Sequence, residues 1–423
     1  MGKRYLAALI QRPLSPITVP LRANHDPAAV AYLVNLLADM LDKPAKVPQL
    51  LSDTGFIQLG EAGRIGDRTA GIESLTAALY QPENRTAVIP VLDQPAPALD
   101  MAFLESHLRE QMRGFDGTGV IYVLDLQTGE ELSINADAAI SGLSTVKIAI
   151  MLEVLRVVDG ELDSDQAKLM AQTAIFSGNY SANLLLDVVA QQDNAYLGVD
   201  ILTESMHRLG LVNTFIATPY EEAPRPTRPT YTTPANQRTD INLDPDPAMQ
   251  TTAEEMGLLL AMVYDCAKGG GALLAAYEGK IAPDECQFLL DLLVQNTEGN
   301  LIRYGVPETV SVAHKHGWAY NTHGDVGVVF SPGGDYVIVQ YLHQDSDWLN
   351  ANVSFPLLRE LSRSVYNYFN VDNPYVDHKR AQKGAGKRAM ETILAQIEAG
   401  TLSIQPVEET SEPTNEESND AIP

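Results

Sequence analysis

Hydrophobic residues recur at helical spacing near the start of the chain, where the pattern predicts a small α+β domain. In the helix expected over 26–41, Asp26 is a candidate N-cap and Pro27 stands at the first helical position. The elements expected after it are a turn over 63–67, a helix over 71–80, a strand over 85–91 and a proline-rich linker over 93–97. The first domain is therefore predicted to span residues 1–98.

Residues 99–370 combine strand patterns near both ends with helical patterns between them. Strand patterns lie over 119–126, 131–134, 310–318, 324–330 and 336–342. Helices are expected over 101–113, through most of the stretch up to residue 300, and over 353–369. This order predicts an α+β fold in which one antiparallel sheet packs against a mainly helical part.

Residues 371–423 are predicted to be peripheral, with a surface helix over 379–399. From residue 401 onward the chain has six acidic residues, no Lys or Arg, and many Ser, Thr, Pro and Asn residues. A segment of that composition cannot bury a core, so it is predicted to be a disordered acidic tail.

Length and charge limit what kind of protein this is. At 423 residues the chain exceeds one typical hydrophobic core, so more than one domain is expected. A surface that binds nucleic acid needs a basic face, and the net charge of −26 argues against such a partner. The same charge argues against adhesion to anionic lipid through basic patches.

The two cysteines, Cys266 and Cys286, lack C-x-x-C spacing and have no histidine cluster beside them, so no metal site or cofactor is expected. A disulfide, if the protein is exported, and two unpaired buried thiols are both compatible with their positions. No segment reaches the roughly 18 apolar residues of a transmembrane helix. Residues 1–10 begin like a signal peptide, but their apolar run is too short.

The segment Ser144-Thr145-Val146-Lys147 is the first candidate for chemistry. It opens an apolar, helix-like stretch, so Ser144 and Lys147 would share one helix face, one turn apart. A serine hydroxyl is a weak nucleophile until a base removes its proton, and a neighbouring amine can be that base. The motif alone is weak, because chance produces S-x-x-K about once in a chain of this length. The structural alternative is a serine N-cap followed by a solvated lysine.

Two further triplets supply partners for this pair. Ser177-Gly178-Asn179 precedes a helical pattern, and Lys315-His316-Gly317 lies on a strand pattern. S-x-x-K, S-D-N and K-T-G in this order are the signature of class A β-lactamases and penicillin-binding proteins. Residues 100–370, including the order of their elements, resemble this family of serine hydrolases. The resemblance implies the β-lactamase/transpeptidase fold.

The resemblance also implies acyl transfer, in which Ser144 attacks an amide carbonyl and a neutral Lys147 accepts its proton. Ser177 would relay a proton to the departing nitrogen. Asn179 would hold the amide side chain of the substrate and orient Lys147. The positive charge of Lys315 would help to lower the pKa of Lys147.

The same resemblance assigns the substrate-binding side of the site. Lys315 and His316 would bind the carboxylate of the substrate. The backbone N–H groups of Ser144 and of Trp318, the residue after Gly317, would form the oxyanion hole.

Three positions depart from the family pattern. His316 replaces Thr or Ser, so an imidazole would have to donate the hydrogen bond, and its charge would vary near neutral pH. His323 stands where many members keep a carboxylate-binding arginine, and a histidine in a surface turn is the alternative. Gly178 replaces an aspartate, which would remove a structural hydrogen bond.

The glutamate that activates water for deacylation has no clear counterpart. In the family it lies within Glu-x-x-Leu-Asn, on a loop after the S-D-N helix. The corresponding loop, residues 219–250, offers Glu221 and Glu222 but no following Leu-Asn. Both are candidates for the deacylation base, and two solvated loop acids are the alternative.

Residues 18–97 resemble the peptidoglycan-binding domain of VanW-type cell-wall proteins. The matching features are the helix start at 26–29, the turn at 63–67, and the run 85–91 that leads to a proline linker. The resemblance implies that the first domain binds peptidoglycan. It also implies an extracytoplasmic protein of the bacterial cell envelope.

Three hypotheses about function follow. The first is a serine hydrolase that opens β-lactam amides through an acyl-enzyme on Ser144. The second is a D-Ala-D-Ala peptidase, or penicillin-binding protein, that acts on peptidoglycan stem peptides. The third is a catalytically idle wall-binding protein, against which the intact motif residues weigh. The first is preferred, and a monomer is expected.

Overall fold

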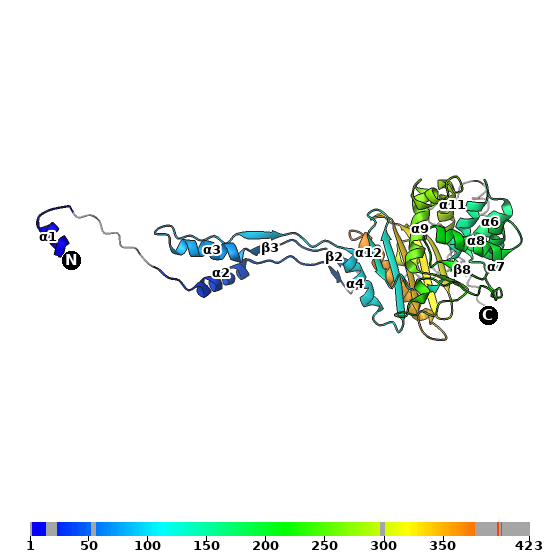
Figure 1. Ribbon diagram of the computed structural model, residues 1–423, viewed down its shortest axis with the longest axis horizontal. Helices are drawn as coiled ribbons and strands as arrows, with labels where there is room; N and C mark the ends of the chain where they lie inside the picture. Colours follow the sequence, from blue (N-terminus) through cyan, green and yellow to red (C-terminus); the bar gives the residue numbers. More distant parts are fainter. Residues whose placement is uncertain are drawn as a thin grey trace, which may run out of the picture. The chain divides into compact units, whose positions relative to one another are not determined.

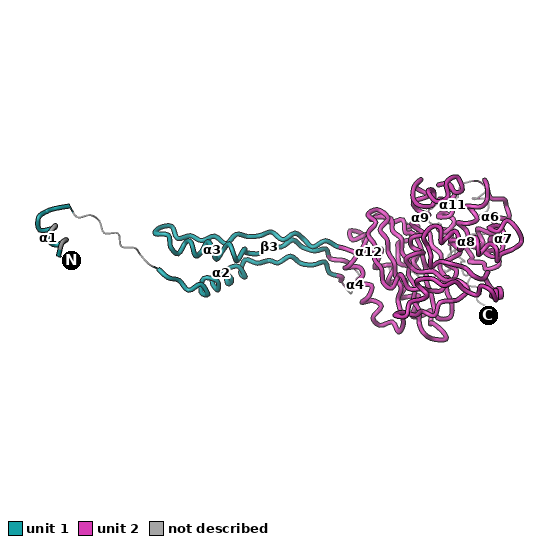
Figure 2. Tube along the Cα trace, in the orientation of Figure 1, with its two compact units in different colours: residues 1–49, 59–99 teal, residues 50–58, 100–423 magenta. Residues whose placement is uncertain are grey.

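The computed structural model describes residues 2–13, 23–51, 56–296 and 301–376, together with Gln396 and Ala399. The chain divides into two compact units, residues 1–49 with 59–99 and residues 50–58 with 100–423 (Figure 2). The acidic tail and, apart from Gln396 and Ala399, the surface helix predicted over 379–399 lie outside the described part. No helix in the described part is long and apolar enough to cross a lipid bilayer.

The first unit contains two packed helices and a two-stranded antiparallel ribbon (Figure 1). Its elements are α1 (Gly2–Leu9), α2 (Pro27–Leu41), β3 (Gly63–Gly66), α3 (Arg68–Leu79) and β4 (Val91–Gln94). Asp26 caps α2 by accepting a hydrogen bond from the N–H of Ala28, which confirms the predicted helix start. The buried residues Val30, Val34 and Ala38 form the side of α2 that packs against α3.

The ribbon of this unit differs from the sequence prediction. Residues 63–66, expected to form a turn, are strand β3, and Asp67 after them caps α3, so that helix begins earlier than predicted. Residues 85–90, expected to form a strand, pair with no described strand. The N–H of Val88 donates to Ser74 Oγ of α3, and Pro90 has no N–H to donate. The pairing therefore starts at residue 91 and takes up part of the predicted linker.

The second unit is built on a five-stranded antiparallel sheet with the strand order β10-β11-β12-β5-β6. The strands are β5 (Thr118–Asp125), β6 (Glu131–Ile134), β10 (Ser311–Trp318), β11 (Thr322–Phe330) and β12 (Tyr336–His343). All five predicted strands are confirmed. Strand β10, which carries Lys315, His316 and Gly317, is an edge strand of the sheet. It is in contact with the helical part of the unit.

Each face of this sheet has its own hydrophobic core, because successive strand residues point to opposite faces. Val120 and Tyr122 of β5 belong to a large core shared with the helical part, including α9 (Ala253–Ala267). Ile121 and Val123 belong to a second core shared with α4 (Met101–Met112) and α12 (Ala351–Phe369). This layered arrangement confirms the predicted α+β fold.

The remaining helices form the helical part of the second unit. They are α5 (Lys147–Val157), α6 (Ser164–Ile175), α7 (Asn179–Ala190), α8 (Ala195–Arg208), α10 (Gly271–Ala276) and α11 (Pro283–Val294), with short 3₁₀ turns at Ala235–Gln237 and Ile302–Gly305. Two small sheets complete the fold, β1 (Gln49–Leu51) with β2 (Phe56–Gln58), and β7 (Ile140–Ser141), β9 (Met249–Thr251) and β8 (Phe215–Ile216). Strands of two or three residues show no periodicity, so the sequence does not predict them.

Cys266, near the end of α9, and Cys286, in α11, form a disulfide, which decides between the two alternatives left open by the sequence. Both side chains are fully buried. The bond joins two helices separated by 20 positions in the chain.

Replacing both cysteines with alanine should lower the free energy of unfolding of the second unit by about 3 kcal/mol, because the unfolded chain regains the entropy of an open loop. Urea unfolding followed by circular dichroism measures the change. The double variant is used because a single substitution leaves a reactive thiol. An unfolding midpoint equal to that of the wild type would show that this bond does not stabilise the unit.

Candidate active site

Ser144 lies in a tight turn between β7 and α5. Leu143, directly before it, has a positive φ of 51°, a conformation that a branched residue adopts only where its surroundings impose it. The N–H of Gly142 donates to the carbonyl of Met249 at 2.9 Å, which fixes the turn to β9. Ser144 is partly exposed between buried neighbours, and no side chain caps α5. The hydroxyl is therefore free of a capping role.

Lys147, the first residue of α5, is completely buried. Its Nζ lies 3.0 Å from Ser144 Oγ, 2.7 Å from the carbonyl oxygen of Ser177 and 2.6 Å from Asn179 Oδ1. These contacts exclude the alternative of a capping serine followed by a solvated lysine. They also bring together three of the residues that the motifs predict.

The contacts of Lys147 fit a neutral amine. Burial, followed by the positive charge of Lys315, lowers the pKa of Lys147 to about 7, against the opposing charge of Glu221. A neutral amine has two N–H groups and one lone pair. The carbonyl of Ser177 and Oδ1 of Asn179 only accept hydrogen bonds, so they take the two N–H groups. The lone pair is then left to accept the proton of the Ser144 hydroxyl.

Ser177 lies between the two lysines of the site. Lys315 Nζ donates to Ser177 Oγ at 2.7 Å, and Lys147 Nζ stands 3.4 Å from the same oxygen. Ser177 has a positive φ of 56°, which sets its carbonyl and its hydroxyl toward the lysines. Lys315 is itself completely buried on the edge strand β10.

The loop over 219–250 places the two candidate glutamates differently. Asn179 Nδ2 donates to Glu221 Oε1 at 2.8 Å, so Glu221 reaches the site. Glu221 has a positive φ of 61°, which turns its side chain back toward α7. Glu222 is exposed, and its hydrogen bonding among the described residues is a backbone contact with Pro219. Only Glu221 is therefore placed beside the predicted motif residues.

Two contacts hold this loop in position. The side-chain amide of Asn183 in α7 makes two hydrogen bonds to the backbone of Tyr220. Its Oδ1 accepts from the N–H at 2.9 Å, and its Nδ2 donates to the carbonyl at 2.8 Å. Farther along, Arg225 makes a bidentate pair with Asp200 of α8 at 2.7 and 2.8 Å. The backbone next to Glu221 is thus fixed by two helices.

Tyr220 is a site residue that the sequence analysis did not identify. Its ring centre lies 4.4 Å from Lys147 Nζ, and its hydroxyl donates to the carbonyl of Leu143 at 2.8 Å. The side chain is buried, and burial raises the pKa of its hydroxyl, so it is neutral and keeps its proton for that bond. The one sequence signal is its position beside Glu221 in an otherwise polar loop.

Gly317 brings the edge strand against the backbone of Ser144. A Cβ atom at position 317 would stand 2.8 Å from the nitrogen of Ser144 and 2.6 Å from Leu143 Cβ, so only glycine allows this approach. The N–H of Ser144 donates to no group among the described residues. Trp318 follows directly, with an exposed side chain. Both residues predicted to form an oxyanion hole therefore lie at this contact.

His316 and His323 are placed differently from what their predicted role requires. Successive strand residues alternate between faces, so His316 lies on the opposite sheet face to Lys315. Trp318 shares the face of His316, and its cross-strand partner His323 lies on that face as well. Burial lowers the pKa of His316 to about 3 and that of His323 to about 4. The expectation that the charge of His316 varies near neutral pH is therefore wrong.

His323 is also not the histidine of a surface turn. It is buried in strand β11, and its Nδ1 is hydrogen-bonded to Ser354 Oγ of α12 at 2.6 Å. Both imidazoles are neutral at pH 7. Neither therefore supplies the positive charge of the carboxylate-binding arginine that many family members have at the position of His323.

Glycine stands at position 178 where the family pattern has an aspartate, and neighbouring side chains supply a hydrogen bond at this turn. A Cβ atom there would stand 2.5 Å from Ser181 Oγ. That hydroxyl accepts from Thr173 at 2.9 Å and donates to the carbonyl of Gly178 at 3.1 Å. Ser181 therefore supplies a structural hydrogen bond at this turn.

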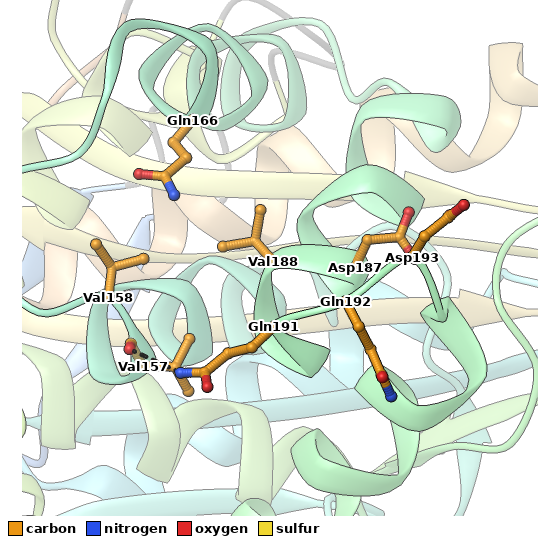
Figure 3. Close-up of a pocket in the computed structure, with 8 residues that line it drawn as sticks. All are labelled: Val157, Val158, Gln166, Asp187, Val188, Gln191, Gln192 and Asp193. Atoms are coloured by element: carbon orange, nitrogen blue, oxygen red, sulfur yellow. Dashed lines mark hydrogen bonds between the residues drawn. The ribbon is translucent and has the colours of Figure 1, made fainter.

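A separate pocket of about 520 Å³ lies at the far ends of two helices of the site (Figure 3). Val157 at the end of α5 and Asp187 near the end of α7 line it, whereas Lys147 and Asn179 begin the same helices. The pocket is therefore not part of the site around Ser144. Among the described residues, no group of three or more His, Cys, Asp and Glu side chains is placed to hold a metal ion.

The fold and the site define a class of protein. An antiparallel sheet with helices on both faces, and a serine and a lysine in contact at the start of a buried helix, match the β-lactamase/transpeptidase fold. The model of the β-lactamase enzyme family named Beta-lactamase2 matches residues 103–369, which is more than half of the chain. The chain belongs to this family.

Several solved structures are similar to this chain. A mutant of PBP-A in an acyl-enzyme complex with penicillin G is 18% identical, with 65% of this chain and 99% of that chain covered and a TM-score of 0.48. A β-lactamase from Desulfarculus baarsii is 19% identical, with coverages of 64% and 98% and a TM-score of 0.48. A mutant of the class A β-lactamase of the last common ancestor of Gram-negative bacteria is 23% identical, with coverages of 63% and 98% and a TM-score of 0.47. The family assignment rests on the match over residues 103–369.

The protonation of Lys147 can be followed directly by NMR titration of ¹³Cε-labelled lysines. In the wild type its signal should titrate near pH 7, with the ammonium form below that pH and the amine above it. Tyr220→Leu removes the ring that stabilises the ammonium form but keeps an apolar cover, so the pKa should fall by roughly 0.5–1 pH unit.

Tyr220→Phe is the matched control, because it keeps the ring and loses only the hydroxyl, so its titration should stay close to that of the wild type. Lys147→Arg identifies the signal. A pKa that does not change in Tyr220→Leu would contradict the role given to the ring.

Proposed function

We propose that this protein is a serine hydrolase that forms an acyl-enzyme on Ser144 and that its substrates are β-lactam amides. The observation that carries the proposal is the set of contacts of Lys147 Nζ, at 2.6, 2.7 and 3.0 Å, which leaves a lone pair aimed at the Ser144 hydroxyl. An amine with a pKa of about 7 is half deprotonated at neutral pH and is well matched to that proton transfer.

In the acylation step, the proton of Ser144 passes to Lys147 Nζ as the oxygen forms a bond to the amide carbonyl. The negative charge on the carbonyl oxygen is held by the N–H groups of Ser144 and Trp318. The C–N bond of the amide then breaks. Ser177 gives its proton to the departing nitrogen and regains one from the ammonium of Lys147, which stands 3.4 Å away.

The positive charge of Lys315, 2.7 Å from Ser177 Oγ, supports this proton relay and attracts the carboxylate of a substrate. Asn179 orients Lys147 through Oδ1 and presents Nδ2 toward the side where the substrate amide would lie. His316 and His323 are buried and neutral, so any contribution that they make to carboxylate binding is through hydrogen bonds alone.

In the release step, Glu221 is proposed to take a proton from water, whose oxygen attacks the ester carbonyl and frees Ser144 with its proton restored. The bond from Asn179 to Glu221 supports this assignment over Glu222. Glu221 is exposed and sits on a strained backbone position, while the ring of Tyr220 covers Lys147 from the same loop. An exposed base on a strained backbone favours slow release, which is the property of a D-Ala-D-Ala peptidase or penicillin-binding protein and makes it the second candidate.

We further propose that the protein works outside the cytoplasm, at the cell wall. The buried disulfide supports an oxidising compartment, because such bonds are rare in the reducing cytosol. The resemblance of residues 18–97 to VanW-type domains supports peptidoglycan as the partner of the first unit. Pull-down of the full chain with purified peptidoglycan tests this proposal.

Incubation with a penicillin followed by mass spectrometry tests the central proposal. The intact protein should gain the mass of the opened β-lactam, and a peptide digest should place it on Ser144. Ser144→Ala should abolish the adduct, because among the described residues the Ser144 hydroxyl is the one nearest to Lys147 Nζ, at 3.0 Å against 3.4 Å for Ser177. An adduct that persists in that variant, or no adduct and no turnover with any β-lactam or D-Ala-D-Ala peptide, would overturn the proposal.

Glu221→Gln should slow hydrolysis of the acyl-enzyme by roughly 10²–10³-fold while acylation stays within a few-fold of the wild type, because only release needs a carboxylate base. Stopped-flow absorbance with a chromogenic cephalosporin separates the two steps. Glu222→Gln is the matched control and should behave like the wild type. Equal effects in both variants would show that neither residue is the base. Fast turnover in the wild type favours a β-lactamase, and a long-lived adduct favours the peptidase.

A further inference from the structure

Helix α2 of the first unit is apolar on two sides; one contains the buried residues that pack against α3, and the other is exposed. Val30, Val34 and Ala38 form the covered side. Asn35 and Asp39 are the strongly polar residues of this 15-residue helix, and they stand one turn apart on a narrow strip. A helix that is hydrophobic all round is normally buried, so the second apolar side needs a partner.

The second side has the spacing of a coiled-coil seam. Ala29, Leu33, Leu36 and Met40 follow one another at intervals of four, three and four residues, which is the a and d pattern of a heptad. The exposed fractions of Leu33, Leu36 and Met40 are 43%, 45% and 76%. Tyr32 and Leu37 flank the seam and are exposed as well. The pattern is that of a helix prepared to pack against another helix.

The exposed area is sufficient for a specific interface. The large apolar side chains of this face and its flanks are Tyr32, Leu33, Leu36, Leu37 and Met40, each at least 42% exposed. Together they offer on the order of 550 Å², so two copies would bury about 1,100 Å², which exceeds the ~1,000 Å² expected of a specific interface.

Charge narrows the choice of partner. Helix α2 contains no Lys or Arg, whereas a helix that binds a membrane surface usually carries them beside its apolar face. Asp39 and Asp42 share one cationic partner, Arg68 of α3, so this end of the helix keeps a net negative charge. The chain as a whole carries a net charge of −26, which disfavours an anionic lipid surface.

A second copy of the same helix satisfies these conditions, because the seam is complementary to itself. We propose that α2 pairs with α2 of a second copy and makes this protein a homodimer. This proposal differs from the monomer expected from the sequence, which stays an untested prediction. The inference rests on the first unit alone and does not depend on the function proposed for Ser144.

The seam favours an antiparallel pair. In that arrangement Leu33 faces Leu36 of the other copy, and the small Ala29 faces the long Met40, so the volumes match at each layer. A parallel pair would place Met40 against Met40 and would bring the acidic ends at Asp39 and Asp42 together. Antiparallel helices also place their dipoles in opposite directions, which is the more favourable arrangement.

Light scattering of the full chain after size-exclusion chromatography tests the dimer. The wild type should show twice the mass of one chain at high concentration, and Leu36→Glu should show the mass of one chain. Val88→Glu is the matched control, because Val88 is an apolar residue of the same unit that is 63% exposed, bonds through its N–H to Ser74 of α3 and is not part of the seam. It should leave the dimer intact. Circular dichroism and hydrolysis of the β-lactam substrate should be the same in all three proteins.

A wild type that stays monomeric up to ~1 mM, the weakest range of specific affinities, would overturn the proposal. A dimer that survives Leu36→Glu would overturn it too, because the contact would then lie elsewhere. Cysteine cross-linking tests the direction, since both native cysteines are bonded to each other. Mixed Ala29→Cys and Met40→Cys proteins should form a disulfide-linked pair on oxidation. Met40→Cys that links to itself as readily would overturn the antiparallel arrangement.

Discussion

The burial of the Lys147 amine is the constraint around which the second unit is organised. An ammonium ion without water is costly, so a completely buried lysine must either lose its proton or be surrounded by acceptors. Here the carbonyl of Ser177 and Oδ1 of Asn179 accept hydrogen bonds from two N–H groups of Lys147. The Ser144 hydroxyl lies within hydrogen-bond distance of the same nitrogen. Ser177 and Asn179 come from the segment that opens α7, and Ser144 comes from the turn before α5, so the position of one nitrogen depends on how α5, α7 and that turn pack.

That packing is held at several points where the backbone is strained. Leu143, Ser177 and Glu221 all have positive φ without being glycine, and all three border the same site. Such conformations persist only where the surroundings over-determine them. Three sets of hydrogen bonds supply this constraint. A carbonyl of β9 binds the turn before Ser144, Asn183 binds the backbone next to Glu221, and Arg225 joins the same loop to α8 through an ion pair. The hydrophobic cores on both sheet faces make these contacts rigid.

The sequence predicted those parts of the molecule whose information is local. The strand run 336–342 is almost continuously apolar, and the motifs at 144–147, 177–179 and 315–317 have an order that chance rarely produces. Helical spacing predicted the contact between Ser144 and Lys147, and the contact forms across a turn, because α5 begins only at Lys147. By contrast, residues 85–90 alternate like a strand, yet Val88 bonds to Ser74 and Pro90 cannot donate, so tertiary contacts override the pattern.

Other features depend on contacts between distant segments and have no local signal. Nothing in the order Tyr220-Glu221-Glu222 tells which residue faces Lys147, because the left-handed backbone at Glu221 decides it. The charge of His316 was misjudged for a similar reason. A position beside a lysine of the predicted site suggests exposure, but strand alternation places the imidazole on the other face of the sheet, where burial keeps it neutral. Sequence patterns identify the residue types of this site, and the fold decides their directions.

The two halves of the proposed reaction are built with unequal rigidity. The groups that would acylate Ser144 are buried lysines held at hydrogen-bond distance by side chains of two helices and an edge strand. The group that would release it is a single exposed carboxylate, held by one hydrogen bond from Asn179. Because Asn179 also orients Lys147, any substrate that draws the Asn179 amide away from Glu221 weakens the hold on the release group. In the proposed reaction, substrate binding and acyl release would therefore compete for one side chain, and this competition would favour a slow second step.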